Sequence, residues 1–291
     1  ARLAAMTPRL VAGSLSGFGQ GGPCAQRAGY VVLLQGMGGL MSVTGEHDHL
    51  PGGGPQKIGV ALTDILTGMY ATTAIQAAII EREKSGLGRH IDLALLDVQV
   101  ACLANQGMNY LVSHDTPKRM GNAHPNIVPY QTFQTADGHI ILTIGNDKQF
   151  ADFCQVAQCQ TFINDPLFAT NQARVHNREI VIEQLANIIQ AKSSEFWLQQ
   201  LEIKGVPCGP INNIAQVFDN PQIKHRNMLG ELNHPHNGKV PTVANPINFS
   251  RTPIEYKQAP PNLGEHTENV LSGLLGYDKN TISNLRKSKI I

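Results

Sequence analysis

The stretch from Ile58 to Asp92 constrains the fold of this chain more than any other. Between Leu62 and Ile80 nearly every residue is apolar or small, so a helix here would be apolar almost all the way round, and such a helix belongs in a core. After Asp64 the next charges are at Glu81 to Lys84, and Gly86 follows where a helix end favours a left-handed residue. The sequence therefore predicts a long, buried helix that ends near Ser85.

Asp64 stands in the first turn of this expected helix. The unpaired N–H groups and the positive dipole end favour a carboxylate there and keep it ionised. Most Asp residues at such a position are helix caps. An ionised carboxylate at a buried helix start is also a good nucleophile for an activated acyl group, whose oxyanion the nearby N–H groups could hold. Spacing alone leaves both interpretations open.

Strand-like and helix-like segments alternate around this helix. Arg9 to Ser16 and His90 to Leu95 have the composition of strands, whereas Tyr30 to Met41 and Leu96 to Val112 have helical spacing. This alternation predicts an α/β unit with a parallel sheet. The glycines of the Tyr30–Met41 segment would cost stability unless a neighbour approaches closely.

The second half of the chain indicates a smaller unit. Tyr130 to Phe133 and Gly138 to Ile144 alternate as two strands around an Ala-Asp-Gly turn, which predicts a hairpin. Arg178 to Lys192 and Ser194 to Lys204 have the spacing of amphipathic helices. The loop before the hairpin, which contains a Gly-Asn turn and His124, is either a plain connection or a loop that closes over a small ligand.

Composition and motifs exclude several classes of function. The net charge of +1, from 23 basic and 22 acidic residues, favours neither nucleic acid nor an anionic membrane surface as a partner. No apolar run reaches the roughly 18 residues of a membrane span. Five cysteines without a C-x-x-C pair suit free thiols in a reducing compartment, so we expect a cytoplasmic protein.

Two motifs are too weak to carry a function. The glycines at 17, 19 and 22 match G-x-G-x-x-G, but Pro23 and Gly29 interrupt the helix that a dinucleotide site needs there. Glu46, His47, Asp48 and His49 look like metal ligands, yet they lie in a loop rich in Gly and Pro, which is a poor scaffold for a metal. We therefore expect solvated polar residues there and no metal.

Five segments in sequence order resemble one family. They are GYVVLLQGMGGLMSVTG at 29–45, LTDILTGMY at 62–70, GNAHPNIVPYQTFQTADGHIILTIGNDKQF at 121–150, VPCGPINN at 206–213 and PPNLGEHT at 260–267. Together they resemble the class III CoA-transferases, the family of formyl-CoA transferase and carnitine CoA-transferase. The resemblance covers essentially the whole chain and implies that the N-terminal part of a typical member is missing from it.

The resemblance implies a fold and an assembly. We expect 1–115 to form part of a large Rossmann-like, parallel-sheet domain that binds CoA, 116–225 to form a smaller α+β domain, and 226–291 to return to the large domain. Members of this family form interlocked homodimers, so the expected partners are an acyl-CoA, a small carboxylic acid and a second copy of the chain. No cofactor is expected, because CoA is a co-substrate.

The resemblance also implies roles for particular residues. The family's catalytic aspartate matches Asp64, which would attack the acyl-CoA thioester and form an anhydride. The family's CoA-contacting segment matches Arg27, Ala28, Gly29 and Tyr30. The glycine loop that shields the anhydride from water matches Gly121, Asn122, Ala123 and His124, although this chain has fewer glycines there than formyl-CoA transferase.

Two further alternatives follow from the resemblance. The α-methylacyl-CoA racemases of the family use the same aspartate as a base, opposite a histidine at the position of Tyr30. A phenol with a pKa near 10 is a poor acid/base at neutral pH, so transfer is favoured over racemisation.

Val31 also departs from the family, since many members have an acidic residue there. The last alternative is a truncated, inactive relative with a structural role.

Overall fold

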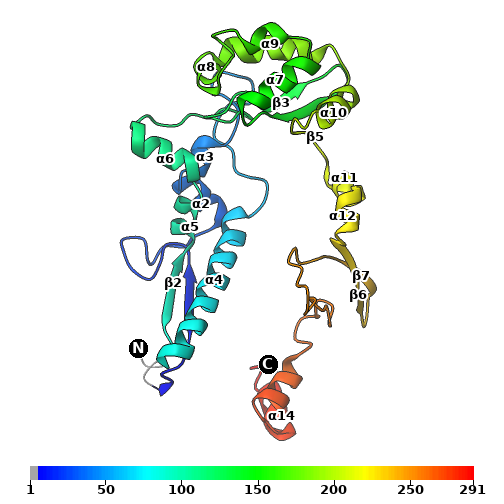
Figure 1. Cartoon of the computed structure of the whole chain (residues 1–291). Helices are drawn as coiled ribbons and strands as arrows, with labels where there is room; N and C mark the ends of the chain where they lie inside the picture. Colours follow the sequence, from blue (N-terminus) through cyan, green and yellow to red (C-terminus); the bar gives the residue numbers. More distant parts are fainter. Residues whose placement is uncertain (1–5) are drawn as a thin grey trace. The chain divides into compact units, whose positions relative to one another are not determined.

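A computed structural model describes residues 6–291 of the chain. These residues divide into two compact units, one that ends at Pro210 and one that runs from Ile211 to Ile291 (Figure 1). The expected domain boundaries near residues 115 and 225 remain predictions.

A parallel pair of strands organises the first part of the chain. β1 (Ala12–Ser16) pairs with β2 (His90–Ala94) in parallel, from Ala12 opposite His90 to Ser16 opposite Ala94. Helices α2 to α4 connect the two strands, which is the crossover that a parallel pair requires. The predicted α/β rhythm with a parallel sheet is therefore confirmed.

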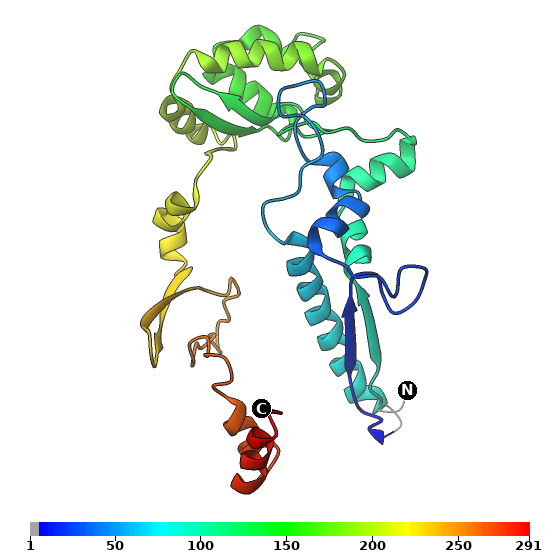
Figure 2. The same cartoon turned by 180° about the vertical axis from the view of Figure 1, so that it is seen from behind.

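Helix α4 (Leu62–Ser85) runs beside this strand pair, as both views show (Figures 1 and 2). It ends at Gly86 in the left-handed conformation, with φ of 76°, so the predicted end is confirmed. The prediction that the helix is buried is wrong for this chain. Its buried residues are Thr63, Thr67, Ala71 and Ala78.

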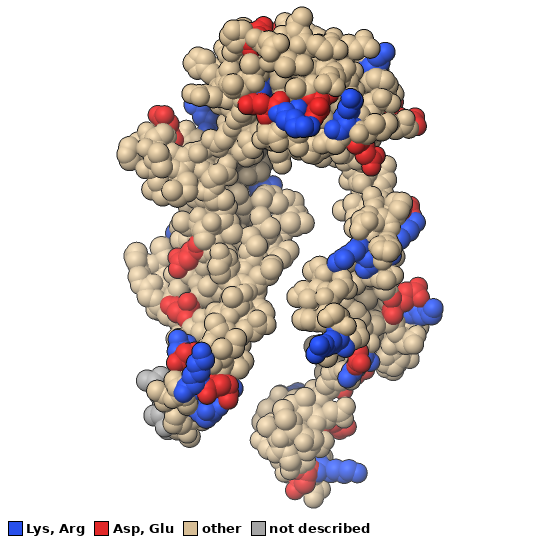
Figure 3. Space-filling model, in the orientation of Figure 1, with Lys and Arg blue, Asp and Glu red and all other residues tan. Residues whose placement is uncertain are grey.

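The rest of α4 is an apolar surface. Ile65, Met69 and Ile80 are 56 %, 63 % and 64 % exposed, and Figure 3 shows few charged side chains over the helix before its C-terminal end. The strand pair and its flanking helices contact only one side of α4, because within residues 6–291 this sheet has two strands. Composition alone could not show how much of the helix would be covered.

Both flanking helices are divided in two. The expected helix at 30–41 forms α2 (Val31–Met37) and α3 (Leu40–Val43), separated at Gly39, whose φ is 84°. The expected helix at 96–112 forms α5 (Leu95–Ala101) and α6 (Ala104–Ser113). A positive φ of 47° at Ala104 turns the chain between them.

Residues 128–210 form an antiparallel sheet covered by helices. β3 (Tyr130–Gln134) and β4 (His139–Thr143) form the predicted hairpin, and β5 (Cys208–Pro210) adds to β4. The helices here are α7 (Asp147–Val156), η1 (Gln160–Ile163), α8 (Asn171–His176), α9 (Arg178–Gln190) and α10 (Ser194–Ile203). Their apolar faces enclose one core, which includes Phe133, Leu142, Phe153, Leu185 and Trp197.

Arg174 lies fully buried beside this core. Its guanidinium donates to Val128 O at 2.7 Å, Phe168 O at 2.7 Å and Asp147 Oδ1 at 2.8 Å. It also lies 4.3 Å from the centre of the Phe150 ring. These contacts satisfy a charge that would otherwise be costly to bury.

The second unit is built from short elements. α11 (Ile214–Asp219) and α12 (Pro221–His225) precede an antiparallel pair, β6 (Leu229–His234) and β7 (Gly238–Val243). α13 (Thr267–Asn269), the π-helical turn η2 (Val270–Leu274) and α14 (Lys279–Lys287) follow. Across the described part of the chain, every helix is too short or too polar to traverse a bilayer.

Candidate active site around Asp64

The start of α4 leaves the Asp64 side chain free. Ala61 is the N-cap residue and provides no side-chain cap. Asp64 is the third residue of the helix and is exposed, and within residues 6–291 its side chain takes part in no hydrogen bond or ion pair. It therefore lies in the first turn, as predicted, but does not cap the helix. Its carboxylate is available to a ligand.

A buried polar cluster lies behind Asp64. Thr63 Oγ1 donates to Gln99 Oε1 at 2.6 Å, and Thr67 Oγ1 donates to Thr63 O at 2.7 Å. Before the helix, Ile58 N donates to Gln35 Oε1 at 2.9 Å. No local sequence signal marks these side chains, because their partners lie at least 23 positions away or one helical turn away in a helix expected to be apolar.

Arg27, Ala28, Gly29 and Tyr30 lie at the carboxyl ends of the two parallel strands. A Cβ atom on Gly29 would lie 2.7 Å from the Cα of Gly17, the residue that follows β1. Gly17 O in turn accepts from Leu96 N, just after β2, at 3.0 Å. Tyr30 is the N-cap residue of α2 and is 77 % exposed. Ligands of α/β sheets bind at this end of the strands.

The first turn of α4 lies toward the same end of the strands. The C-terminal end of the helix is fixed at the opposite end, where Gly88 N donates to Pro8 O at 2.7 Å and Arg9 pairs with Glu83 at 2.8 Å. The 24 residues of α4 span about 36 Å, against about 17 Å for a five-residue strand. Asp64 therefore lies beyond the carboxyl ends of β1 and β2.

The loop at 121–124 is joined to the loop at 44–57. Gly121 N donates to Gly45 O at 3.0 Å, and a Cβ atom on Gly121 would lie 2.8 Å from both carboxylate oxygens of Glu46. Arg119 pairs with Asp48, and this hydrogen bond lowers the pKa of Asp48. The polar residues at 46–49 were expected to be solvated, and Asp48 and His49 are exposed. Glu46 is half-buried beside Gly121.

The other end of this loop is held by the hairpin and by α9. Asn122 Nδ2 donates to Thr132 Oγ1 at 3.1 Å, and His124 N donates to Tyr130 O at 3.0 Å. Arg178 Nη2 donates to His124 O at 2.8 Å. Burial, and then the charge of Arg178, lower the pKa of His124. The loop therefore holds a neutral imidazole at neutral pH.

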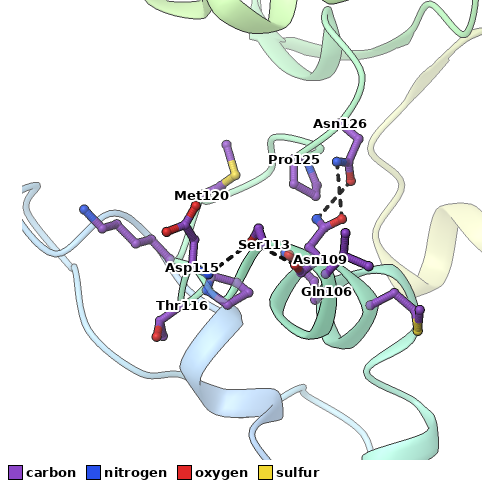
Figure 4. A pocket seen from close by; sticks show the side chains of 12 residues that line it. Gln106, Asn109, Ser113, Asp115, Thr116, Met120, Pro125 and Asn126 are labelled. Carbon is purple, nitrogen blue, oxygen red and sulfur yellow. Dashed lines mark hydrogen bonds between the residues drawn. The ribbon is translucent and has the colours of Figure 1, made fainter.

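A cavity of about 510 Å³ is lined in part by Met120 and Pro125, the residues on either side of this loop. α6 and the segment that follows it line the cavity, and Asn109 lies opposite Asn126, with Asn109 Nδ2 donating to Asn126 Oδ1 at 3.2 Å (Figure 4). Ser113 Oγ accepts from Asp115 N at 3.0 Å. Amides and hydroxyls thus form one polar wall beside the loop.

The structure places the three predicted segments in one unit without direct bonds between their side chains. Among residues 6–291, no hydrogen bond or ion pair joins Asp64 to the segment 27–30 or to the loop 121–124. The loop 44–57 connects them indirectly, since it contacts Gly121 at one end and leads into α4 at the other. In the same residues, no three His, Cys, Asp or Glu side chains converge as metal ligands would.

These features define an α/β protein with a free, helix-borne carboxylate beyond the carboxyl ends of parallel strands. Residues 1–267 match the family model of CoA-transferase family III, and the chain belongs to that family. It is 46 % identical over 272 residues to a succinate–glutarate CoA-transferase of Agrobacterium fabrum. The aligned residues cover 94 % of this chain and 67 % of that relative.

Two further similarities agree with this family. The chain is 39 % identical over 286 residues to a succinyl-CoA:glutarate CoA-transferase of Homo sapiens, covering 98 % of this chain and 64 % of that protein. A crystal structure of a CaiB/BaiF family protein from Brucella suis is 45 % identical, with a TM-score of 0.76, and covers 94 % of this chain and 70 % of the other. The chain spans about two thirds of the length of the curated relatives that it matches.

Proposed function

We propose that the protein containing this chain transfers CoA from an acyl-CoA to a carboxylic acid, with Asp64 as the nucleophile. The observation that carries the proposal is the exposed Asp64 carboxylate, which has no bond to a protein group among residues 6–291 although it lies in the first turn of α4. The membership of the chain in CoA-transferase family III supports the reaction class. The unpaired N–H groups of the first turn could hold an oxyanion beside this carboxylate.

The reaction proceeds through acyl transfers to and from Asp64. Its carboxylate oxygen attacks the thioester carbon, the C–S bond breaks, and an anhydride and a CoA thiolate form. The thiolate then attacks the aspartyl carbonyl carbon, which releases the donor acid and leaves an aspartyl–CoA thioester. The acceptor carboxylate attacks this thioester, the C–S bond breaks, and a second anhydride and the thiolate form. The thiolate attacks the acceptor carbonyl carbon of this anhydride, which forms the new acyl-CoA and frees the Asp64 carboxylate. Each step displaces a good leaving group, either a thiolate, whose thiol has a pKa near 8.5, or a carboxylate.

Other segments would bind the substrates. The backbone of residues 27–30 lies at the strand ends, where CoA would bind, and the loop 121–124 would cover the anhydride and exclude water. The contacts of this loop with Glu46, Thr132 and Arg178 support a fixed loop conformation. The names of the relatives support a dicarboxylic substrate pair, such as succinyl-CoA and glutarate.

A second copy of the chain would cover the apolar surface of α4. Ile65, Met69 and Ile80 are exposed in the single chain, and an exposed apolar patch of this kind marks an interaction surface. We therefore propose a homodimer. The five cysteines are all free thiols, which supports a cytoplasmic location.

Trapping of the covalent intermediate tests the role of Asp64. The full-length protein is incubated with succinyl-CoA and treated with hydroxylamine or borohydride, and the modified peptide is identified by mass spectrometry. We expect the label on the peptide that contains Asp64. Asp64→Asn should reduce CoA transfer by about 10⁴-fold or more, because an amide cannot form the anhydride.

Three outcomes would contradict the proposal. They are a label on another peptide, transfer by Asp64→Asn at a comparable rate, or no transfer by the wild type to any dicarboxylic acid. Exchange of the α-hydrogen of an acyl-CoA with solvent deuterium, without transfer, would indicate the racemase reaction instead.

A further inference from the structure

We infer that Gln99 is a positioning residue for Asp64 and acts through the hydroxyl of Thr63. This inference rests on the proposed role of Asp64. Gln99 lies on α5 and Thr63 lies on α4, directly before Asp64. Their 2.6 Å hydrogen bond joins the first turn of one helix to the neighbouring helix.

The first turn of α4 has few other side-chain ties. No side chain caps the helix at Ala61, and the hydroxyl of Thr67 bonds to its own helix rather than to a neighbour. Among the described residues, the hydrogen bond from Thr63 to Gln99 is the one side-chain bond that joins this turn to another helix. The orientation of the Asp64 backbone therefore depends on it.

Gln99 is an unfavourable choice if its role is only to stabilise the core. Its side chain is 1 % exposed, and its amide Nε2 is buried without a partner among residues 6–291. An unpaired buried donor reduces stability, whereas an apolar side chain of similar size would not. The chain thus retains at this position a group that costs stability, which indicates a role in function.

The neighbouring backbone makes room for this glutamine. A Cβ atom on Gly38 would overlap Cγ of Gln99, so the glycine between α2 and α3 permits the approach. This confirms the expectation that a neighbour packs closely against the glycines of this segment. A second buried amide, Gln35, accepts from Ile58 N at 2.9 Å and fixes the chain four residues before Leu62.

The two glutamines hold the entry to α4 at both ends. Gln35 fixes residue 58 and Gln99 fixes residue 63, so the segment that leads to Asp64 has little freedom to rotate. A nucleophile gains rate from such fixed orientation, and a displacement of 1 Å can cost about 10²-fold in rate. Gln99 therefore acts on the turnover of Asp64 without touching the substrate.

Three variants and one matched control test the inference in the full-length protein. Thr63→Val and Gln99→Leu each remove one partner of the bond, and the double variant removes both. Thr135→Val makes the same buried substitution outside α4, since the Thr135 hydroxyl is buried and bonds to Ser194 Oγ at 2.7 Å. For each protein we would measure kcat and KM for CoA transfer from succinyl-CoA to glutarate, Tm, and amide hydrogen exchange of residues 58–66.

The expected result separates positioning from stability. Each single variant should lower kcat by about 10- to 100-fold with little change in KM. The double variant should recover or exceed the Tm of the wild type, because neither partner of the bond is left behind unpaired and the unpaired Nε2 of Gln99 is removed, while kcat stays low. Thr135→Val should keep the kcat of the wild type. A kcat that recovers with Tm in the double variant, or an equal loss of kcat in Thr135→Val, overturns the inference.

Hydrogen exchange distinguishes this inference from the proposed function. If the wild type transfers no CoA, but Gln99→Leu and not Thr135→Val accelerates exchange at 58–66, the helix start is held as inferred and the assigned reaction is wrong. If transfer depends on Asp64, while exchange and kcat are unchanged in Gln99→Leu, the role of Gln99 is wrong and the reaction stands.

Discussion

Residues 128–206 and residues 12–113 bury their apolar side chains very differently. The first region encloses a continuous core of aromatic and aliphatic residues, and its hairpin and helices cover it from all sides. In the second region, α4 buries two threonines and two alanines and exposes most of its large side chains. The first region is closed by its own residues, whereas the second presents an apolar surface and the candidate nucleophile.

The closed core and the candidate nucleophile lie in different regions of the chain. A closed core gives residues 128–206 a stability of their own, and the region contributes the hairpin and Arg178, which hold the loop 121–124. The region around α4 combines buried polar side chains with an open apolar face. Such a region reaches its full stability only when another surface covers it.

The largest expected effect is on the closed region, at Arg174. Arg174→Met leaves Val128 O and Phe168 O without their donor, so we expect a loss of roughly 2–4 kcal/mol in the free energy of unfolding. Trp197 is the single tryptophan and is 1 % exposed in this core, so its fluorescence during urea unfolding reports on this region.

The control for Arg174 is Lys148→Met. Lys148 is exposed and pairs with Asp152 one turn along α7 at 2.7 Å, a surface pair that contributes about 0.3–0.5 kcal/mol. Equal shifts of the Trp197 transition in the two variants would show that the buried guanidinium does not support this core.

The second effect concerns the open face of α4. Met69→Lys places a charge on the surface that we propose is covered in a dimer, and it should weaken dimerisation at least tenfold, about 1.4 kcal/mol. Sedimentation velocity across a dilution series measures the change. Ile203→Lys, at a side chain that is 76 % exposed on α10, should leave dimerisation unchanged. A wild-type protein that sediments as a folded monomer at micromolar concentration would rule out the dimer.

A smaller effect is expected where the two regions meet at Gly121. Gly121→Ala introduces strain at a φ of 57° and also forces Glu46 away. Gly52→Ala, at a φ of 81° with nothing within 4 Å of the new atom, introduces strain alone. We expect Gly121→Ala to lower the free energy of local opening of residues 119–124 by about 1 kcal/mol more than Gly52→Ala does at its own loop. Amide hydrogen exchange measures the free energy of local opening of both loops. Equal losses in the two variants would show that the Glu46 side chain moves away from the new methyl group without measurable cost.

The smallest effect is the pH dependence that arises from His124. Its pKa is lowered in the folded chain, so below about pH 6.5 the unfolded chain binds a proton that the folded chain does not. Stability should therefore fall as the pH drops from 7.5 to 5.5 and should be independent of this group above that range. His124→Gln should flatten the dependence of the Trp197 transition, and the exposed His139→Gln should not. If His139→Gln flattened the pH dependence and His124→Gln did not, the assignment of this dependence to His124 would be wrong.

Much of the local structure could be predicted because its signals lie close together in the sequence. The end of α4 follows from Gly86, and the β3–β4 hairpin follows from two alternating strands around a short turn. Asp64 could be placed in the first turn of α4 for the same reason. Its role as nucleophile, and the roles of residues 27–30 and 121–124, remain predictions that rest on the family.

The contacts that hold the candidate site could not be predicted. Gln99 meets Thr63 across 36 positions, and Glu46 meets Gly121 across a still longer separation. Arg174, which resembles a surface residue on a short helix, becomes buried because three acceptors and the Phe150 ring surround it. Each side chain is chemically ordinary, and only its neighbours give it a role.

The sequence by itself determined the type and order of the elements and the family to which the chain belongs, because hydrophobic period, turn residues and short motifs are local properties. The tertiary structure decided which face of α4 is buried, which side chains hold Asp64 in place, and that its carboxylate is free. These depend on distances between residues far apart in the chain. The apolar composition of a helix shows only that its burial would be favourable. The neighbouring elements determine how much of its surface is buried.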